Sequence, residues 1–255
     1  MSRKIAFITG ASAGIGAATA KLLASQQYNL ILAARRVESL KKLSDELTTQ
    51  FGISTLVVKL DVRNRNEVAE TIAAFPKDWQ KINVLVNNAG LASGLSSIDE
   101  GDMDDWDVMI DTNVKGLLYV TRNVIPLMKS NESGHIINIG SIAGKDVYPN
   151  GVVYCATKHA VDALSKGMRM DFLPYNIKVT QICPGAVETE FSLVRFKGNQ
   201  DRADQVYAGF ENLVADDIAE AVYYAVSQPA HVNIQDVLVM PTAQASGSLF
   251  HKEIK

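Results

Sequence analysis

The alternation of short apolar runs with longer amphipathic stretches constrains the fold of this chain more than any other feature of its sequence. Seven apolar runs follow one another in this way, beginning with KIAFITG and NLILAAR and ending with DVLVMPT. Strands that are apolar throughout are typical of parallel sheets covered by helices on both faces. A closed (β/α)8 barrel would need one more unit and would not explain a glycine-rich loop after the first run. We therefore expect an α/β fold with an open, doubly wound, seven-stranded parallel sheet.

Length and composition are those of one ordinary globular domain. The 255 residues contain no linker, repeat or low-complexity tract, and 47% of them are hydrophobic. We expect a single domain over residues 1–255, in which a loop near residues 188–212 forms a lid over the substrate. The two cysteines, Cys155 and Cys183, are too few for a disulfide framework and belong to no ligand cluster. We expect both thiols to be buried, and we expect no metal site.

Charge and the N-terminal segment argue against several classes of partner. A net charge of -3 and a pI near 5.8 give no positive field that would attract nucleic acid or an anionic membrane. The segment MSRKIAFITG has too few apolar residues for a secretory signal, and no run approaches the roughly 18 apolar residues of a membrane span. We therefore expect a cytoplasmic protein whose partner is a small-molecule substrate.

A glycine-rich loop, TGASAGIG, follows the first apolar run and leads into an amphipathic stretch. Its spacing, G-x-x-x-G-x-G, differs from the common G-x-G-x-x-G, but the glycines can serve the same purpose. They permit a tight turn, let backbone N–H groups approach a pyrophosphate, and allow the helix to pack closely. A tight strand-to-helix turn without a ligand is the alternative. We expect a dinucleotide here, in contact with Gly10, Ser12, Gly14, Ile15 and Gly16.

Residues at the ends of the second and third strands indicate which dinucleotide is bound. Arg35 and Arg36 follow NLILAA, where an NAD-binding chain is expected to carry an acidic residue for the ribose 2′-hydroxyl. Arginine can instead hold a 2′-phosphate, so we expect NADP, with Arg35 as the first choice of contact. A solvated arginine pair is the alternative. After the third strand, Asp61 can accept from the adenine amino group beside Val62, or it can cap a turn.

Polar residues also end the fourth and fifth strands. The fourth ends in NNAG, and buried amides at a strand tip must be hydrogen-bonded, which fits a wall of the cofactor site. The fifth ends in HIINIGS, but no G-x-S-x-G elbow surrounds Ser141. We therefore expect Ser141 to be a neutral donor to a substrate oxygen rather than a nucleophile. The residues of NNAG that we assign to the cofactor are Asn88, Ala89 and Gly90.

The sequence YCATK places Tyr154 four residues before Lys158, at the start of an amphipathic stretch. At that spacing both side chains share one helical face, so the lysine ammonium can stabilise the phenolate of the tyrosine. Its pKa, ordinarily roughly 10, would then fall toward neutrality, and the phenol could remove the proton of an alcohol or return it. A tyrosine and a lysine at this spacing are also common on ordinary helices, so the pair indicates a catalytic role only together with other motifs.

Five features together resemble the signature of the short-chain dehydrogenase/reductase family, in order and spacing, over residues 4–242: TGASAGIG, NNAG, Asn113, Ser141 and YCATK. The resemblance implies a Rossmann-type fold, commonly a homotetramer, and hydride transfer between NAD(P) and an alcohol or carbonyl. It further implies that Asn113 supports a water link to Lys158, and that this lysine also holds the nicotinamide ribose. Cys155 departs from the family pattern, which often has serine there, but the tyrosine and lysine positions are intact.

The segment CPGAVETEF follows the sixth strand. Pro184 stiffens the turn ahead of Gly185, and the backbone of Val187 with the Thr189 hydroxyl can bind the nicotinamide carboxamide. A purely structural turn is the alternative.

The lid then supplies a candidate anchor for an anionic substrate. Arg195 can donate two parallel hydrogen bonds to a carboxylate, whereas Lys197, the second choice, offers only a flexible point charge. The alternatives for Arg195 are solvent exposure or an ion pair with Glu188 or Glu190.

The segments ETEFSLVRFKGN and PAHVNI resemble one branch of the family, the NADP-dependent 3-hydroxy acid dehydrogenases. This resemblance implies oxidation at the 3-hydroxyl of small acids such as L-allo-threonine, L-serine and 3-hydroxypropionate. Reduction of other small carbonyls, such as sulfoacetaldehyde, aldehydes or diketones, is the alternative within the family. A non-catalytic NADP(H)-binding sensor or scaffold is the alternative outside it. A sensor would not need the complete set of catalytic residues, namely Asn113, Ser141, Tyr154 and Lys158.

Overall fold

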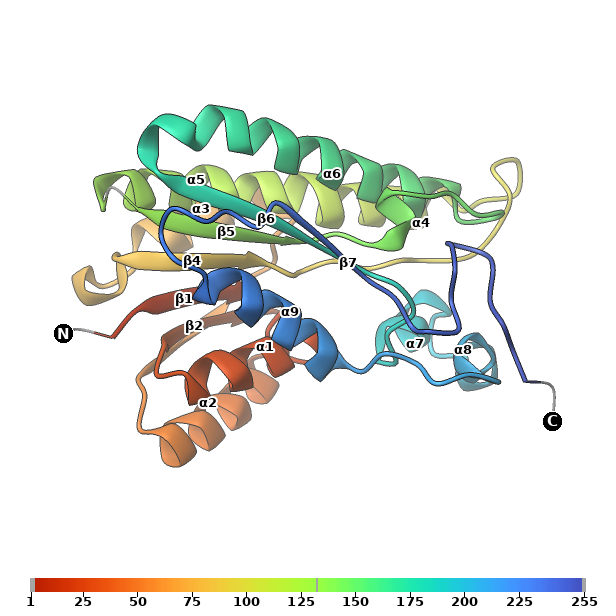
Figure 1. Ribbon diagram of the computed structural model, residues 1–255, viewed down its shortest axis with the longest axis horizontal. Coiled ribbons are helices and arrows are strands. Elements are labelled where there is room, and N and C mark those ends of the chain that lie inside the picture. The colour runs from red at the N-terminus through yellow and green to blue at the C-terminus, as the bar shows by residue number, and fades with distance from the viewer. Residues whose placement is uncertain (1–2, 132, 254–255) are drawn as a thin grey trace.

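Strands and helices alternate along the chain, and the strands form one parallel sheet (Figure 1). The computed structural model describes residues 3–131 and 133–253. Across the sheet the strand order is β3-β2-β1-β4-β5-β6-β7, which confirms the predicted doubly wound, seven-stranded Rossmann-type fold. In chain order the strands are β1 Ile5–Thr9, β2 Asn29–Ala34, β3 Thr55–Lys59, β4 Ile82–Asn87, β5 Gly134–Ile139, β6 Ile177–Pro184 and β7 Asp236–Val239.

Helices cover both faces of the sheet and explain why its strands are apolar throughout. Neighbouring side chains on β1 show this directly: Phe7 packs in the core on one face and Ile8 in the core on the other, both 0% exposed. Successive side chains of a strand point to opposite faces, so a sheet covered on both needs no polar positions. On the face of Ile8 lie α1 Gly14–Ser25, α2 Val37–Phe51 and α9 Ala215–Ser227; on the face of Phe7 lie α3 Arg65–Ala73, α5 Leu117–Ser130 and α6 Val152–Phe172 (Figure 1).

The strand order reverses between β1 and β4. β1 pairs with β2 on one side and with β4 on the other, so the loops that leave β1 and β4 diverge toward opposite faces. In open sheets of this kind, ligands bind in the crevice beyond the carboxyl ends of the strands at such a switch point. The loop TGASAGIG follows β1 and NNAG ends β4, so both predicted cofactor motifs lie at this crevice.

One long helix departs from the sequence-based expectation. The sequence predicts a helix from about residue 106 to 129, whereas α4 begins earlier and spans Met103–Ile110. It begins earlier because the Asp102 side chain accepts a backbone N–H of the first turn. A π-helical turn, Asp111–Gly116, then joins α4 to α5. Such wide turns shift the helix face by one residue and are frequent at functional sites.

The segment that the sequence assigns to a substrate lid, residues 188–212 (the lid segment), contains two short helices beyond the carboxyl ends of the strands (Figure 1). These are α7, Phe191–Arg195, and α8, Gln200–Tyr207. Cys155 and Cys183 are both buried, as the sequence predicts. Within residues 3–131 and 133–253, no helix combines the length and the apolar character that crossing a membrane requires.

Candidate active site

A cavity of about 670 Å³ lies at the carboxyl ends of the strands. The strand-end loops form its floor, and residues of the lid segment complete its wall. Every residue that the sequence assigns to the cofactor, to catalysis or to the substrate lines this cavity, except Gly16 and Asn113. Those two lie behind the lining, where Gly16 leaves room for the glycine loop and Asn113 hydrogen-bonds Leu91 and Thr157.

The glycine loop is packed too tightly for side chains. A Cβ atom on Gly16 would lie 2.4 Å from the carbonyl oxygen of Gly10, and Gly10 itself has a φ of +65°. Asn88 fixes this arrangement from β4, since its Nδ2 donates to the carbonyls of Thr9 at 3.0 Å and Gly10 at 3.1 Å. The residue before α1, Ala13, provides no side-chain cap, so the first N–H groups of the helix can serve an anion. The loop therefore fits the pyrophosphate of a dinucleotide.

Basic side chains gather at one end of the cavity, after β2. Arg36 Nε donates to Ser12 Oγ at 3.2 Å, and Arg36 Nη1 pairs with Glu190 Oε2 at 2.9 Å. Arg35 is exposed at the same edge. The guanidinium groups of Arg35 and Arg36 and the Ser12 hydroxyl lie where the end of β2 meets the glycine loop. Together they offer the donors that a phosphate monoester needs. This corner fits the 2′-phosphate of NADP, and Arg36 rather than Arg35 makes the contacts to Ser12.

Asp61 follows β3 and accepts hydrogen bonds from Arg63 within the same turn. Arg63 Nη2 donates to Asp61 Oδ2 at 2.6 Å, and the Arg63 backbone N–H donates to Asp61 Oδ1 at 3.1 Å. The hydrogen bond from the Arg63 side chain lowers the pKa of the Asp61 carboxyl. Asp61 thus caps a turn, as the alternative interpretation holds, while its carboxylate still lines the cavity. Val62 beside it packs against Gly116 of the π-helical turn.

Three of the proposed catalytic residues converge on the centre of the cavity. Ser141 follows β5, while Tyr154 and Lys158 lie on the first turns of α6, and they are 9%, 8% and 6% exposed. Lys158 Nζ donates to the carbonyl of Ile139 at 2.9 Å and lies 5.9 Å from the centre of the Tyr154 ring. Burial lowers the pKa of Lys158 to about 8.

Burial also governs the acidity of Tyr154. It raises the pKa of the phenol well above its usual range, and the Ser141 hydroxyl opposes only part of that change. The sequence argument expects the Lys158 ammonium to lower this pKa, but in the structure the ammonium is hydrogen-bonded to Ile139 and desolvation of the phenol prevails. Without ligands, Tyr154 is therefore a neutral phenol that can donate a proton to a substrate oxygen.

Asn113 lies behind the lining of the cavity and hydrogen-bonds residues next to the site. Its Nδ2 donates to the carbonyl of Leu91 at 2.8 Å and to Thr157 Oγ1 at 3.0 Å, and its Oδ1 accepts from the Leu91 N–H at 2.9 Å. These bonds tie the chain after NNAG, through the π-helical turn, to the residue beside Lys158. Thr157 is a participant that the sequence reasoning missed, although it lies within YCATK.

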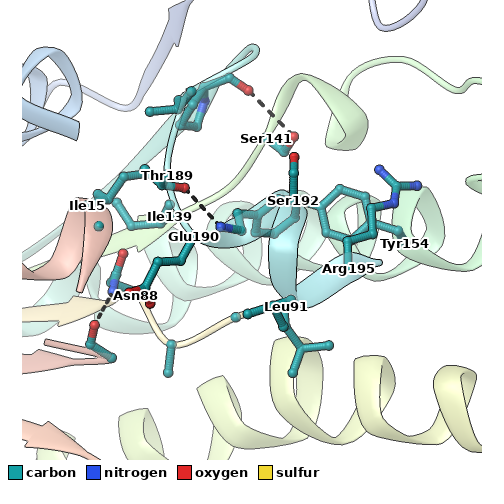
Figure 2. A pocket seen from close by; sticks show the side chains of 18 of the residues that line it. Ile15, Asn88, Leu91, Ile139, Ser141, Tyr154, Thr189, Glu190, Ser192 and Arg195 are labelled. Atoms are coloured by element: carbon teal, nitrogen blue, oxygen red, sulfur yellow. Dashed lines mark hydrogen bonds between the residues drawn. The ribbon is translucent and has the colours of Figure 1, made fainter. Parts of the chain in front are cut away.

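Arg195 lies over the ring of Tyr154, the tyrosine that the sequence proposes as catalytic (Figure 2). Its Cζ is 5.8 Å from the centre of the Tyr154 ring, its Nη1 donates to the Tyr148 hydroxyl at 3.2 Å, and its Nε donates to the Gly94 carbonyl at 3.1 Å. Its buried Nη2 has no hydrogen-bond partner among the described residues. Among the described residues Arg195 forms no ion pair with the lid glutamates, and its Nη2 is a buried donor without a partner in a side chain that lines the cavity.

Lys197, the second choice of anchor, is engaged elsewhere. Its Nζ lies 2.9 Å from Asp105 Oδ1 and 3.3 Å from Asp102 Oδ2, at the start of α4. It does not line the cavity. Its contacts instead join the lid segment to α4 and leave Arg195 as the lid cation that faces the site.

The turn after β6 closes the end of the cavity that the sequence assigns to the nicotinamide. The Gly185 N–H donates to the carbonyl of Val239 at 2.7 Å, and the Ala186 N–H donates to Gln244 Oε1 at 2.8 Å. Val187 then pairs with Leu213 in a short β-bridge, and the Thr189 side chain contacts Gly14 of the glycine loop. Pro184 ends the strand itself. Gln244 is a second residue that the sequence reasoning missed, because nothing near it in sequence suggests a role.

Comparison with known proteins agrees with this geometry. A family model described as short chain dehydrogenase matches residues 4–200. The NADP-dependent 3-hydroxy acid dehydrogenase YdfG of Salmonella typhi is 46% identical over 246 residues, which cover 96% of this chain and 98% of that protein. The sulfoacetaldehyde reductase of Chromohalobacter salexigens is 43% identical over 240 residues, 94% of each chain.

A solved structure described as the closed form of serine dehydrogenase complexed with NADP+ has the same fold. Its TM-score is 0.92 at 43% sequence identity, over 98% of this chain and 100% of that chain. Relatives of this identity and coverage, together with the match of the family model, confirm the resemblance found in the sequence motifs. The chain belongs to the short-chain dehydrogenase family.

Proposed function

We propose that this protein is an NADP-dependent oxidoreductase acting at the 3-hydroxyl or 3-oxo carbon of small 3-hydroxy acids. The substrates are of the L-allo-threonine, L-serine and 3-hydroxypropionate type. The observation that carries the proposal is the guanidinium of Arg195, which lies 5.8 Å from the ring of Tyr154 with a buried, unpaired Nη2. The names of similar proteins, a 3-hydroxy acid dehydrogenase and a serine dehydrogenase, support it.

The residues present suit NADP as the cofactor. When bound, NADP⁺ accepts the hydride that leaves the carbon of the alcohol. Arg36, Ser12 and Arg35 would hold its 2′-phosphate, and the N-terminus of α1 its pyrophosphate. Lys158 would hold the nicotinamide ribose, and Thr189 the carboxamide.

The chain's own residues manage the proton and the charge on the substrate oxygen. Tyr154 takes the hydroxyl proton during oxidation, and it returns a proton to the same oxygen during reduction. The Ser141 hydroxyl donates to that oxygen and stabilises the charge that develops there. Asn113 acts at a distance by fixing Thr157, next to Lys158.

Arg195 orients the substrate through its carboxylate. A buried donor without a partner is unfavourable by about 1–3 kcal/mol, and a carboxylate accepting from Nη2 relieves this. Tyr148 fixes the direction of the guanidinium, because its hydroxyl accepts from Nη1. A small polar substrate buries little apolar area, so a charged anchor supplies the orientation that hydride transfer needs.

Steady-state kinetics with a 3-hydroxy acid and its methyl ester test this anchor. Arg195→Ala should lower kcat/KM for the acid by about ten- to a hundredfold, the worth of a charge-assisted hydrogen bond, and change the ester far less. Lys197→Ala is the matched control, since it removes a cation of the same lid segment that contacts α4 instead. Equal losses for acid and ester, or a wild type that prefers the ester, would rule the anchor out.

Reduction of a small sulfonated carbonyl is a second candidate. Arg195 can hold a sulfonate as well as a carboxylate, and the similarity to a sulfoacetaldehyde reductase favours it. Measuring kcat/KM for sulfoacetaldehyde beside that for the 3-oxo acids distinguishes the two substrate classes.

Assembly and location belong to the same proposal. A homotetramer in the cytoplasm agrees with the family resemblance. It would cover apolar side chains at the end of α6 such as Met170 and Leu173, which are 74% and 75% exposed in the single chain.

A further inference from the structure

Glu190 of the lid segment reaches across the cofactor groove to the basic corner after β2. Its Oε2 lies 2.9 Å from Arg36 Nη1, and the same guanidinium donates through Nε to Ser12 of the glycine loop. Figure 2 shows Glu190 beside Thr189 and Asn88, on the side of the pocket away from Arg195. The half-exposed carboxylate of Glu190 therefore lies at the edge of the groove, in contact with Arg36.

The Glu190 carboxylate does not cap the helix that follows it, α7. Glu190 immediately precedes α7, where an acidic side chain commonly accepts an N–H of the first turn. Its side chain makes no such bond, and the first-turn N–H of Phe191 donates to Thr189 Oγ1 instead. Thr189 in turn packs against Gly14, which holds the start of the lid over the glycine loop. Glu190 is thereby positioned to meet Arg36.

We infer that Glu190 is an internal competitor for the 2′-phosphate subsite and so a residue that sets the preference for NADP over NAD. This rests on the proposed role of Arg36 in holding the 2′-phosphate. A carboxylate and a phosphate cannot both take the same guanidinium N–H, and their negative charges repel each other at such separations. A 2′-phosphate that binds this N–H of Arg36 therefore displaces Glu190, whereas NAD, which has a hydroxyl there, leaves the ion pair in place.

The ion pair also links the cofactor to the substrate lid. Glu190 lies five residues before Arg195, which is held to Gly94 and Tyr148 on the opposite side of the cavity. Displacement of Glu190 breaks this one contact of the lid segment, while Thr189 stays packed against Gly14 and Arg195 stays attached to Gly94 and Tyr148. The 2′-phosphate is then the part of the cofactor that releases this contact.

Binding of NADP⁺ and NAD⁺ to the ligand-free protein, measured by isothermal titration calorimetry, tests the inference. Glu190→Gln keeps the shape of the side chain and removes its charge. Because both partners are about half exposed, the pair is a surface ion pair, and its removal should tighten NADP⁺ about two- to fivefold. NAD⁺ affinity should stay the same. Glu188→Gln, the control, removes an exposed lid carboxylate that does not contact Arg36, and should change neither affinity.

Two further variants separate this inference from the role of Arg36. Arg36→Ala should weaken NADP⁺ selectively, and adding Glu190→Gln to it should have no further effect, because the shared partner is gone. If Arg36→Ala weakens NADP⁺ but Glu190→Gln leaves NADP⁺ unchanged or weakens it, the competition is refuted and the phosphate site stands. If Glu190→Gln tightens both cofactors equally, Glu190 does not act through the 2′-phosphate and the inference also fails. If Arg36→Ala weakens the binding of NADP⁺ and NAD⁺ equally, the proposed 2′-phosphate site is wrong. The proposed competition is then refuted as well.

Discussion

Replacing Lys158 by methionine should make the protein more stable while removing its activity. The side chain is 6% exposed, and its Nζ donates to the carbonyl of Ile139. Methionine is similarly long and unbranched, and it is apolar, so it can fill the same space without a charge. Residues placed for chemistry often reduce the stability of the fold that holds them.

The magnitude follows from the pKa of Lys158. Burial lowers it from 10.5 to about 8. Each unit corresponds to about 1.4 kcal/mol, so the charged lysine destabilises the folded protein by about 3 kcal/mol near neutral pH. Losing the hydrogen bond to Ile139 offsets about 1 kcal/mol, which leaves a net gain of about 2 kcal/mol.

The sign of the pH dependence follows from the same numbers. Between pH 8 and pH 10.5 the unfolded chain keeps the lysine proton and the folded protein has released it. Wild-type stability therefore rises with pH through this window, and the methionine variant lacks that rise. The advantage of the variant should shrink by about 2 kcal/mol between about pH 7 and about pH 9.5.

Urea unfolding of the ligand-free proteins at equal concentration, followed by circular dichroism, measures both quantities. Lys42→Met is the control, because Lys42 is an exposed lysine on α2, and the substitution should change stability by less than about 0.5 kcal/mol. The account is refuted if Lys158→Met is less stable than the wild type near pH 7. A difference that stays constant up to about pH 9.5 contradicts it as well.

Three further predictions concern single residues. Tyr154→Phe should lower kcat by about a hundred- to ten-thousandfold and leave NADP⁺ affinity unchanged, because only the phenolic oxygen is lost; retained turnover would exclude Tyr154 as the proton donor. Burial lowers the pKa of His135 from 6.5 to about 3, so its contribution to stability is complete above pH 6.5 and falls as pH drops. Urea unfolding should show a loss of about 2 kcal/mol between about pH 7.5 and about pH 5, absent in His135→Gln and kept in His231→Gln, an exposed control. Gly16→Ala should destabilise the fold by about 1–3 kcal/mol, because its Cβ would lie 2.4 Å from a loop carbonyl, whereas Gly167→Ala, open on its helix, should stabilise it by about 0.5–1 kcal/mol in thermal melts.

The sheet could be predicted because burial on both faces leaves a direct mark on the sequence. Phe7 and Ile8 are adjacent in the chain yet lie in different cores, so neither position tolerates a polar side chain. The strand-end motifs could be predicted for a related reason, since parallel strands bring their carboxyl ends to one edge. Order along the chain was enough to gather residues from Gly10 to Thr189 around one cavity.

The contacts of the lid segment could not be predicted, because they join positions that no periodicity relates. Arg36 meets Glu190, and Arg195 meets Tyr148 and Gly94, across long stretches of chain. The sequence argument preferred Arg195 to Lys197 because of the geometry of its guanidinium, and it could not predict the position of either side chain relative to the cavity. Lys197 was separated from Arg195 only by its position next to the acidic start of α4.

The π-helical turn that carries Asn113 could not be predicted from the sequence either. A periodicity of 3.6 predicts an unbroken helix there, and the wide turn depends on tertiary packing. Gly116 lets the helix approach Val62, since a Cβ at this position would lie 2.7 Å from Val62 Cγ2. A glycine inside an otherwise amphipathic helix, Gly116, was the available signal.

The sequence argument on the pKa of Tyr154 included the charge of the nearby lysine but left out desolvation. Spacing alone indicates that an ammonium is near the phenol, but it does not indicate how much water either group loses. In the structure desolvation acts on both partners and favours the neutral form of each, raising the pKa of Tyr154 and lowering that of Lys158. The ligand-free protein therefore already carries, on Tyr154, the proton that this residue donates to the carbonyl oxygen in the proposed mechanism. Oxidation requires the phenol to release that proton at the moment the alcohol reacts, so the positive charge of the oxidised cofactor matters more in that direction.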